Sequence, residues 1–350
     1  MINLKIGSGT LKKTILAIAI PALFATGATN AQEIYNDGEN AFSIGGRLNL
    51  MVESANNEGE RDLRSENNSS RINLNFSRKM SENVTARATM EYGLDNPNGN
   101  SDSPFFNRLG FIAVDHADYG SVSYGKQWST YYTITGVTDV FWVYGGTAMG
   151  IYDNGDKAGT ARANDALQYN GSFGGVNLSG QYQFADEDEG RKDSYSGAVS
   201  YDFDFGLNVG ATYHQMNRTD AEKSEVFNDG DAKLTALAAS YNQGPIYAAV
   251  SYGEFKNHVQ FEGATGVSDK AIGHEGVFAY TLDMGLQLYT GWNVQEDKNS
   301  SADLKTALVG AMYDWNNVLL YTEYQDETTK SVSGAKEDDN RLAVGVRYNF

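Results

Sequence analysis

The chain has no cysteine, only four histidines and no long apolar run beyond its first residues. The missing cysteines exclude disulfides, thiolate catalysis and cysteine-based metal sites. The histidines show no ligand spacing such as HExxH, and no serine and histidine are aligned for nucleophilic catalysis. After residue 31 no run reaches the roughly 18 apolar residues that mark a transmembrane helix. We therefore expect no metal, no cofactor, no enzyme and no transmembrane helix.

The first 31 residues form a separate unit of different composition. Three lysines precede an apolar run at 15–25, and acidic residues are absent. The small residues Thr29 and Ala31 stand at the two positions that a signal peptidase reads. Because the run is too short to span a membrane, we predict a secretory signal peptide at 1–31, cleaved after Ala31, and a mature domain at 32–350. An uncleaved anchor is the alternative.

The mature chain is strongly acidic. Without the three lysines of the leader, 24 basic residues stand against 45 acidic ones, a formal charge of −21. A charge of this sign argues against nucleic acid as a partner, because binding to phosphates needs clustered lysine and arginine. It suits a population of cations, so we expect any ion channel built from this chain to prefer cations mildly.

The mature chain repeats one pattern of about ten residues, in which apolar and polar side chains alternate before a turn or loop. In 176–184, Val176 and Leu178 share one face, and Asn177 and Ser179 the other. We count sixteen such candidate strands, joined alternately by short turns and long polar loops. The alternation is unclear in three of them, near 232–241, 304–314 and 317–326.

Strands of this length and pattern favour a membrane barrel. A soluble sandwich would need a second sheet over its apolar face, and a secreted soluble β-protein is the alternative. Strands of about ten residues match a tilted crossing of the hydrocarbon layer, where closure satisfies every backbone group. We predict an all-β fold, a 16-stranded antiparallel transmembrane β-barrel. Its apolar side chains should face lipid and its polar side chains the lumen.

The last strand, RLAVGVRYNF at 341–350, illustrates the two faces. Leu342, Val344, Val346, Tyr348 and Phe350 share one parity and should face lipid. The arginines at 341 and 347 have the other parity and should face the water-filled interior.

One connection, the 35 residues at 127–161, is far longer than the others. A structureless loop of this length is functional or disordered, and its many aromatic residues argue against disorder. We predict that it folds inward against the barrel wall as a constriction loop and narrows the pore.

The stretch RLGFIAVDHADYGSVSYGK (108–126), followed by TDVFWVYGG (138–146), resembles the trimeric general porins of Gram-negative outer membranes. Residues 33–50 and the final RYNF are similar to the two ends of the mature porins. The resemblance implies an outer-membrane channel for passive diffusion of small hydrophilic solutes and ions. It also implies a homotrimer in contact with outer-membrane lipid and lipopolysaccharide, and a barrel-assembly machinery that reads Phe350 as its signal.

In that family a ladder of basic residues on the wall opposes acids on the third loop. The resemblance places the ladder at four arginines: Arg47, Arg71, Arg108 and Arg162. Alternation with Leu48, Ile72 and Leu109 indicates independently that the first three point into the lumen. The alternative for these arginines is ordinary solvation in the lumen or structural pairing with acids such as Glu53 and Glu91. On the loop, Asp139 matches the family's aspartate.

The loop departs from the family pattern at two positions. The family's glutamate falls on Val143 and its proline on Trp142. The acidic side is therefore thinner unless Asp153 or Asp156 compensates.

The residues leave two other functions open. Trp142 and Tyr144 on the long connection would suit a substrate-specific channel, for example for sugars. A barrel with long surface loops would also suit an adhesin or receptor.

Overall fold

The structure is a computed structural model that describes residues 31–57, 60–95, 104–188, 190–218 and 230–350. The predicted signal peptide at 1–31 lies outside the described residues except for Ala31, so its cleavage stays a prediction. None of the described helices is long and apolar enough to cross a membrane.

Within these ranges the chain forms eighteen β-strands and two short helices. In chain order the elements are β1 (Gln32–Asn36), β2 (Asn40–Asn57), β3 (Glu60–Asn67), β4 (Arg71–Lys79), β5 (Val84–Leu94), β6 (Phe105–His116), β7 (Gly120–Trp128), α1 (Thr130–Thr135), α2 (Gly155–Ala158), β8 (Arg162–Phe173), β9 (Val176–Gln183), β10 (Ser194–Asp202), β11 (Leu207–Met216), β12 (Ala232–Gln243), β13 (Ile246–Lys256), β14 (Ala271–Thr281), β15 (Leu286–Asp297), β16 (Asp303–Trp315), β17 (Val318–Lys330) and β18 (Lys336–Asn349).

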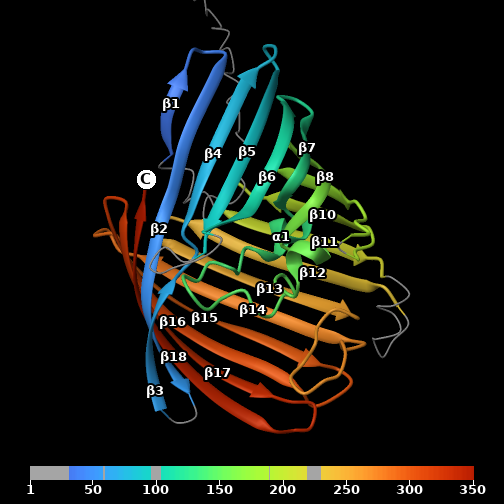
Figure 1. Cartoon of the computed structure of the whole chain (residues 1–350), viewed down its shortest axis with the longest axis vertical. Coiled ribbons are helices and arrows are strands. Elements are labelled where there is room, and N and C mark those ends of the chain that lie inside the picture. Colours follow the sequence, from blue (N-terminus) through green and yellow to red (C-terminus); the bar gives the residue numbers. More distant parts are fainter. Residues whose placement is uncertain (1–30, 58–59, 96–103, 189, 219–229) are drawn as a thin grey trace, which may run out of the picture.

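The strands close into one antiparallel barrel (Figure 1). β2 pairs with β4 along its first half and with β3 along its second half, so β3 and β4 together make one barrel strand interrupted at 68–70. β18 pairs with β2, with Arg347 opposite Asn49, and β1 continues the same edge of β2. Counted this way the barrel has sixteen strands, which confirms the predicted fold class. The short β1 and the extension β3 were not predicted.

The chain end completes the closure. The N–H of Phe350 donates to the carbonyl of Gly46 (3.1 Å), and the N–H of Gly46 donates to the carbonyl of Phe350 (2.9 Å). A side chain at Gly46 would lie 2.5 Å from the carbonyl oxygen of Arg71 and 2.8 Å from the Phe350 ring. Glycine is therefore needed for both neighbours to approach this closely.

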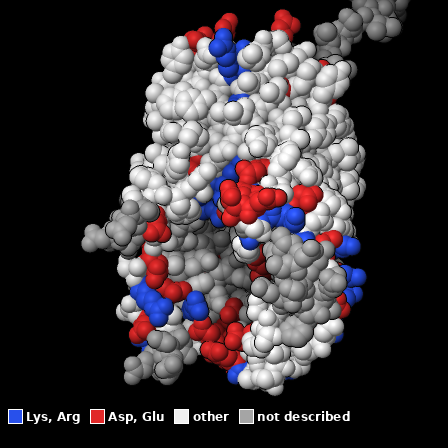
Figure 2. All heavy atoms as spheres, turned by 45° about the vertical axis from the view of Figure 1, so that its right-hand side comes forward, with Lys and Arg blue, Asp and Glu red and all other residues white. Residues whose placement is uncertain are grey.

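The two faces of the strands meet different surroundings. On β18, Val344 on the outer face is 56% exposed, whereas Arg347 on the inner face is 3% exposed. The same arrangement recurs around the barrel: exposed apolar side chains lie on the outer face and buried polar ones on the inner face, as a lipid-facing surface requires. Figure 2 shows a broad surface without charged side chains, and charged side chains gathered around a hollow.

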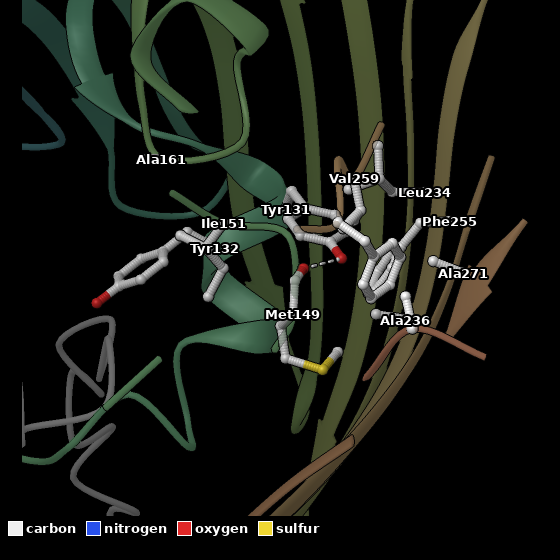
Figure 3. Packing of buried hydrophobic residues seen from close by; sticks show 12 residues of the cluster. Tyr131, Tyr132, Met149, Ile151, Ala161, Leu234, Ala236, Phe255, Val259 and Ala271 are labelled. Carbon is white, nitrogen blue, oxygen red and sulfur yellow. Dashed lines mark hydrogen bonds between the residues drawn. The ribbon is translucent and has the colours of Figure 1, made fainter. Parts of the chain in front are cut away.

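The connection between β7 and β8, residues 129–161, is called loop 3 here and lies inside the barrel with α1 (Figure 1). Tyr131, Met149 and Ile151 of loop 3 pack against Leu234 of β12 and Phe255 of β13, and all five are fully buried (Figure 3). The prediction of an inward-folded loop is confirmed. Its apolar residues form a core between the loop and the wall.

Candidate pore constriction

A cavity of about 610 Å³ lies in the lumen between loop 3 and the opposite wall. Five arginines line it: Arg47, Arg71, Arg108, Arg162 and Arg347. The carboxylates among its lining residues are Asp139 of loop 3 and Asp314 of β16. The structure thus brings together the four predicted arginines and Asp139, and it adds Arg347. Asp153 and Asp156 are not part of this lining.

Arg47 and Arg71 face each other across β2 and β4. Both donate from Nε to the carbonyl oxygen of Ser69, at 3.0 and 3.2 Å. Ser69 lies in the interruption between β3 and β4, with a φ of 66°. The break in this barrel strand therefore supplies the acceptor that holds two like charges side by side.

The carboxylate of Glu91 on β5 is the acceptor for two of the arginines, Arg71 and Arg108. It accepts from Nε of Arg108 at 2.8 Å and from an Nη of Arg71 at 3.3 Å. Arg47 has no carboxylate within ion-pair distance in the part of the chain that the structure describes. Three neighbouring guanidinium groups therefore share one negative charge.

Arg108 owes its direction to a bulge rather than to simple alternation. Leu109 pairs with Glu91 and Asn107 pairs with Tyr92, which leaves Arg108 as the extra residue of β6. Leu109 thus shares a register position with the lumenal Glu91, so the expected alternation with a lipid-facing Leu109 was wrong. The predicted lumenal position of Arg108 is correct, because the bulge turns it inward.

Arg162 stands at the start of β8 beside Asp156. Its Nε lies 3.1 Å from an oxygen of Asp156, whose other oxygen pairs with Lys126 at 2.9 Å. The Arg162 guanidinium also lies over the Trp128 ring, 5.9 Å from its centroid. Asp156 is thus a partner of two basic groups. The sequence had suggested instead that it could be an acid opposed to the arginines across the cavity, and the structure does not place it there.

Asp139 is the one predicted loop acid that reaches the cavity. Its Oδ2 accepts from the hydroxyl of Tyr132 at 2.9 Å and from the hydroxyl of Tyr152. Burial raises the pKa of the Asp139 carboxyl. A side chain at Gly146, whose φ is +74°, would come within 2.6 Å of Asp139, which explains one glycine of the TDVFWVYGG stretch.

Three wall glutamates anchor loop 3, and sequence reasoning missed this role. Glu323 of β17 accepts from the backbone N–H groups of Trp142 (2.8 Å), Val143 (3.1 Å) and Tyr144 (2.7 Å). It also accepts from the hydroxyl of Tyr289 at 2.7 Å. The backbone at the position of the family's loop glutamate therefore receives a carboxylate from the wall.

The other two anchors flank this point. Glu275 of β14 accepts from the hydroxyl of Thr138 at 2.6 Å and from the N–H of Ala148 at 2.7 Å. Glu53 of β2 accepts from the hydroxyl of Tyr144 at 2.8 Å. On β14 the signal in the sequence is a lone carboxylate on an inner face that is otherwise neutral, but the inner face of β17 also carries Glu327 and that of β2 also carries Arg47. The partner of such a carboxylate on a distant loop cannot be deduced from the strand itself.

Comparisons with known proteins agree with this architecture. The Gram-negative porin family matches residues 16–350. Outer membrane protein F of Serratia marcescens is 29% identical, over 97% of this chain and 100% of that protein. Outer membrane porin N of Escherichia coli (strain K12) is 27% identical, over 97% and 100%.

Solved structures share the fold. The complex of Salmonella typhi OmpF with daunomycin superimposes with a TM-score of 0.77 at 24% identity, covering 91% of this chain and all of that one. The anion-selective porin from Comamonas acidovorans gives 0.73 at 18% identity, covering 89% and 100%. The relatives that match the full length are porins, in agreement with the expectation of a channel rather than an enzyme. The chain therefore belongs to the Gram-negative porin family, and its barrel is an outer-membrane protein.

Proposed function

We propose that the chain is a water-filled channel for passive diffusion of small hydrophilic solutes and ions across the outer membrane. The observation that carries this is the lumenal cavity of about 610 Å³ between a row of wall arginines and an anchored loop. Solutes follow their gradient through it. The width beside loop 3 sets the size limit, and the fixed charges orient dipolar solutes.

The constriction is assigned to Arg47, Arg71, Arg108 and Arg162, with Arg347 added from its place in the lining. On the loop side the assignment goes to Asp139.

The ion preference follows from the lining more than from the net charge. The charge of −21 on the mature chain predicted mild cation preference. The cavity, however, is lined by five arginines and two aspartates. Charges on outer loops are screened over about 8 Å at physiological salt. We therefore propose that the constriction favours anions, against the expectation from total charge.

Reversal potentials in planar bilayers under a KCl gradient test both proposals. Arg108→Ala should lower the anion-to-cation permeability ratio by up to about thirtyfold, because a unit charge at about 4 Å in water changes the affinity for each monovalent ion about fivefold, in opposite directions for anion and cation. Arg87→Ala is the matched control, because Arg87 also pairs with an acid, Asp115, but does not line the cavity. Absence of conductance would overturn the channel. A wild-type preference for cations would overturn the anion-favouring constriction and support the estimate from net charge.

The assembly follows the family by analogy, and we propose a homotrimer in contact with lipid and lipopolysaccharide. Its support in this chain is the small outer face of β5 at Ala86 and Ala88, which line a shallow groove. We also propose that Phe350 is read by the barrel-assembly machinery. Migration of unheated and heated protein in detergent gels tests the trimer.

A sugar-specific channel has less support than a general one. Of the two rings that suggested it, Trp142 lines the cavity, but Tyr144 is only 8% exposed and bonded to Glu53. Liposome swelling with sugars of equal size separates the two functions, because a general channel admits them at equal rates. The adhesin or receptor role stays a prediction, tested by loop deletions that abolish cell binding and keep conductance.

A further inference from the structure

The cavity pairs a positive wall with an aromatic loop. We propose that the constriction is a binding slot for planar aromatic carboxylates, such as benzoate, which are held briefly as they pass. The proposal rests on the proposed channel function and names the solute class that this channel retains. Two independent features carry it, the uncompensated charge of the wall and the rings presented by loop 3.

The wall carries more positive charge than its carboxylates balance. Arg71 and Arg108 share the single carboxylate of Glu91, and Arg47 has no carboxylate within ion-pair distance among the described residues. Arg47 and Arg71 use their Nε atoms on the carbonyl of Ser69, at 3.0 and 3.2 Å. Among the described residues, no hydrogen bond or ion pair engages the Nη groups of Arg47, and both arginines line the cavity. The Nη groups of Arg47 can therefore donate two parallel hydrogen bonds to a planar oxyanion, whereas those of Arg71 are engaged by Glu91 and Ser69.

The loop side of the same cavity presents rings. Phe141, Trp142 and Tyr152 of loop 3 all line it. Tyr152 is 48% exposed although it lies inside the barrel and faces no lipid. A ring exposed in the lumen has apolar surface that a passing aromatic solute can cover.

Trp142 joins the two sides of the slot. Its ring stacks on Tyr321 of β17 with centroids 5.6 Å apart and planes 20° apart. The guanidinium of Arg347 lies over the same ring, 5.2 Å from its centroid. The backbone of Trp142 is fixed by Glu323 at 2.8 Å. The ring is therefore held rigidly beside a positive charge. Because it is already ordered, little conformational entropy is lost when a solute binds.

This arrangement distinguishes planar aromatic anions from other solutes. A sugar lacks the charge that the guanidinium groups select, and a small inorganic anion lacks the surface that the rings would cover. The cavity volume of about 610 Å³ falls within the usual range of small-molecule sites. An aromatic carboxylate satisfies both sides at once.

The test compares two monoanions of similar size, benzoate and cyclohexanecarboxylate, on the purified protein in planar bilayers. The measured quantity is the concentration of each acid that halves the KCl current. Benzoate should act at a concentration about three- to tenfold lower, the value of one aromatic contact. Uncharged benzyl alcohol should act far more weakly than benzoate.

Variants divide the effect between ring and charge. Trp142→Leu should bring the ratio of the two acids close to one, and Trp142→Tyr should restore the preference for benzoate. Arg47→Gln should weaken both acids by the same factor. Trp315→Leu is the matched control, because Trp315 lies at the end of β16, is exposed and does not line the cavity. It should leave the ratio unchanged.

The possible results separate the aromatic contact, the arginines and the channel itself. Equal potency of the two acids on the wild type, or an unchanged ratio in Trp142→Leu, overturns the aromatic slot while the KCl conductance still supports the channel. Benzyl alcohol as potent as benzoate overturns the role of the arginines. Absence of KCl conductance in the wild type overturns the proposed function on which the slot depends.

Discussion

Replacing Glu323 with glutamine should loosen the tip of loop 3. In the wild type one carboxylate oxygen accepts from the N–H groups of Val143 and Tyr144, and the other accepts from the N–H of Trp142 and the hydroxyl of Tyr289. Glutamine keeps one acceptor oxygen and turns the other position into a donor. At least one backbone donor is then left facing a donor, and the negative charge is lost.

The magnitude follows from these contacts. A buried donor left without an acceptor costs about 1–3 kcal/mol, and hydrogen bonds to a charged group are worth about 1.5–3 kcal/mol. A loss of about 1.5–3 kcal/mol in local stability raises the population of the opened tip about ten- to a hundredfold. Hydrogen exchange of the peptide that covers 138–148, measured by mass spectrometry, should accelerate by this factor.

Glu327→Gln is the control for this experiment. Glu327 lies on the same strand and accepts from the wall residues Thr306 and Gln325 at 3.1 and 2.9 Å. It undergoes the same chemical change without serving loop 3. The reasoning is refuted if the peptide exchanges at the wild-type rate in Glu323→Gln, or if Glu327→Gln accelerates it equally.

Three further predictions concern the loop, the constriction and the chain end. Gly273→Ala should displace loop 3 and change single-channel conductance, because the new Cβ would lie 1.8 Å from the carbonyl oxygen of Ala148; Gly180→Ala, which meets nothing within 4 Å, should not. Burial raises the pKa of Asp139, so its ionised form costs stability at neutral pH and this cost is relieved as pH falls through the folded pKa. The constriction therefore loses this negative charge at a higher pH than it would if the aspartate were solvated. As pH is lowered, reversal potentials should report a stronger preference for anions in the wild type but not in Asp139→Asn. Deleting Phe350 should reduce the amount of barrel in the outer-membrane fraction several-fold and leave the conductance of assembled channels unchanged; normal assembly would remove the signal role.

The alternation of apolar and polar residues predicts the barrel because each face of most strands meets a single medium. It fails in the strands near 232–241, 304–314 and 317–326 for a physical reason. Their inner faces carry Leu234, Leu308 and Tyr321, which are buried. Leu234 and Leu308 pack in the clusters that loop 3 forms with the wall, and Tyr321 stacks on Trp142. These strands are apolar or aromatic on both faces because a second layer covers the inner one.

The constriction could be predicted only in part. The arginines follow from alternation and resemblance, since a charged side chain in the wall must avoid lipid. The ion-pair partner of each arginine cannot be assigned from alternation or resemblance, because a carboxylate such as Asp156 or Glu91 can lie across the pore or beside the arginine. Alternation also cannot show the extra residue at Arg108, since a bulge is visible only in the pairing with the neighbouring strand.

The positions of the carboxylates explain why the net charge is a poor guide to the pore. Glu323 and Glu275 direct their charge to backbone N–H groups of loop 3, and Glu91 and Asp156 direct theirs to arginines. Asp139, the loop acid that reaches the cavity, is covered by two tyrosine hydroxyls. Apart from Asp314, which also lines the cavity, the acids nearest the pore are thus engaged in holding the structure, whereas five guanidinium groups line the space through which solutes pass. An acidic protein can therefore present a positive constriction, because anchoring and selection use different charges.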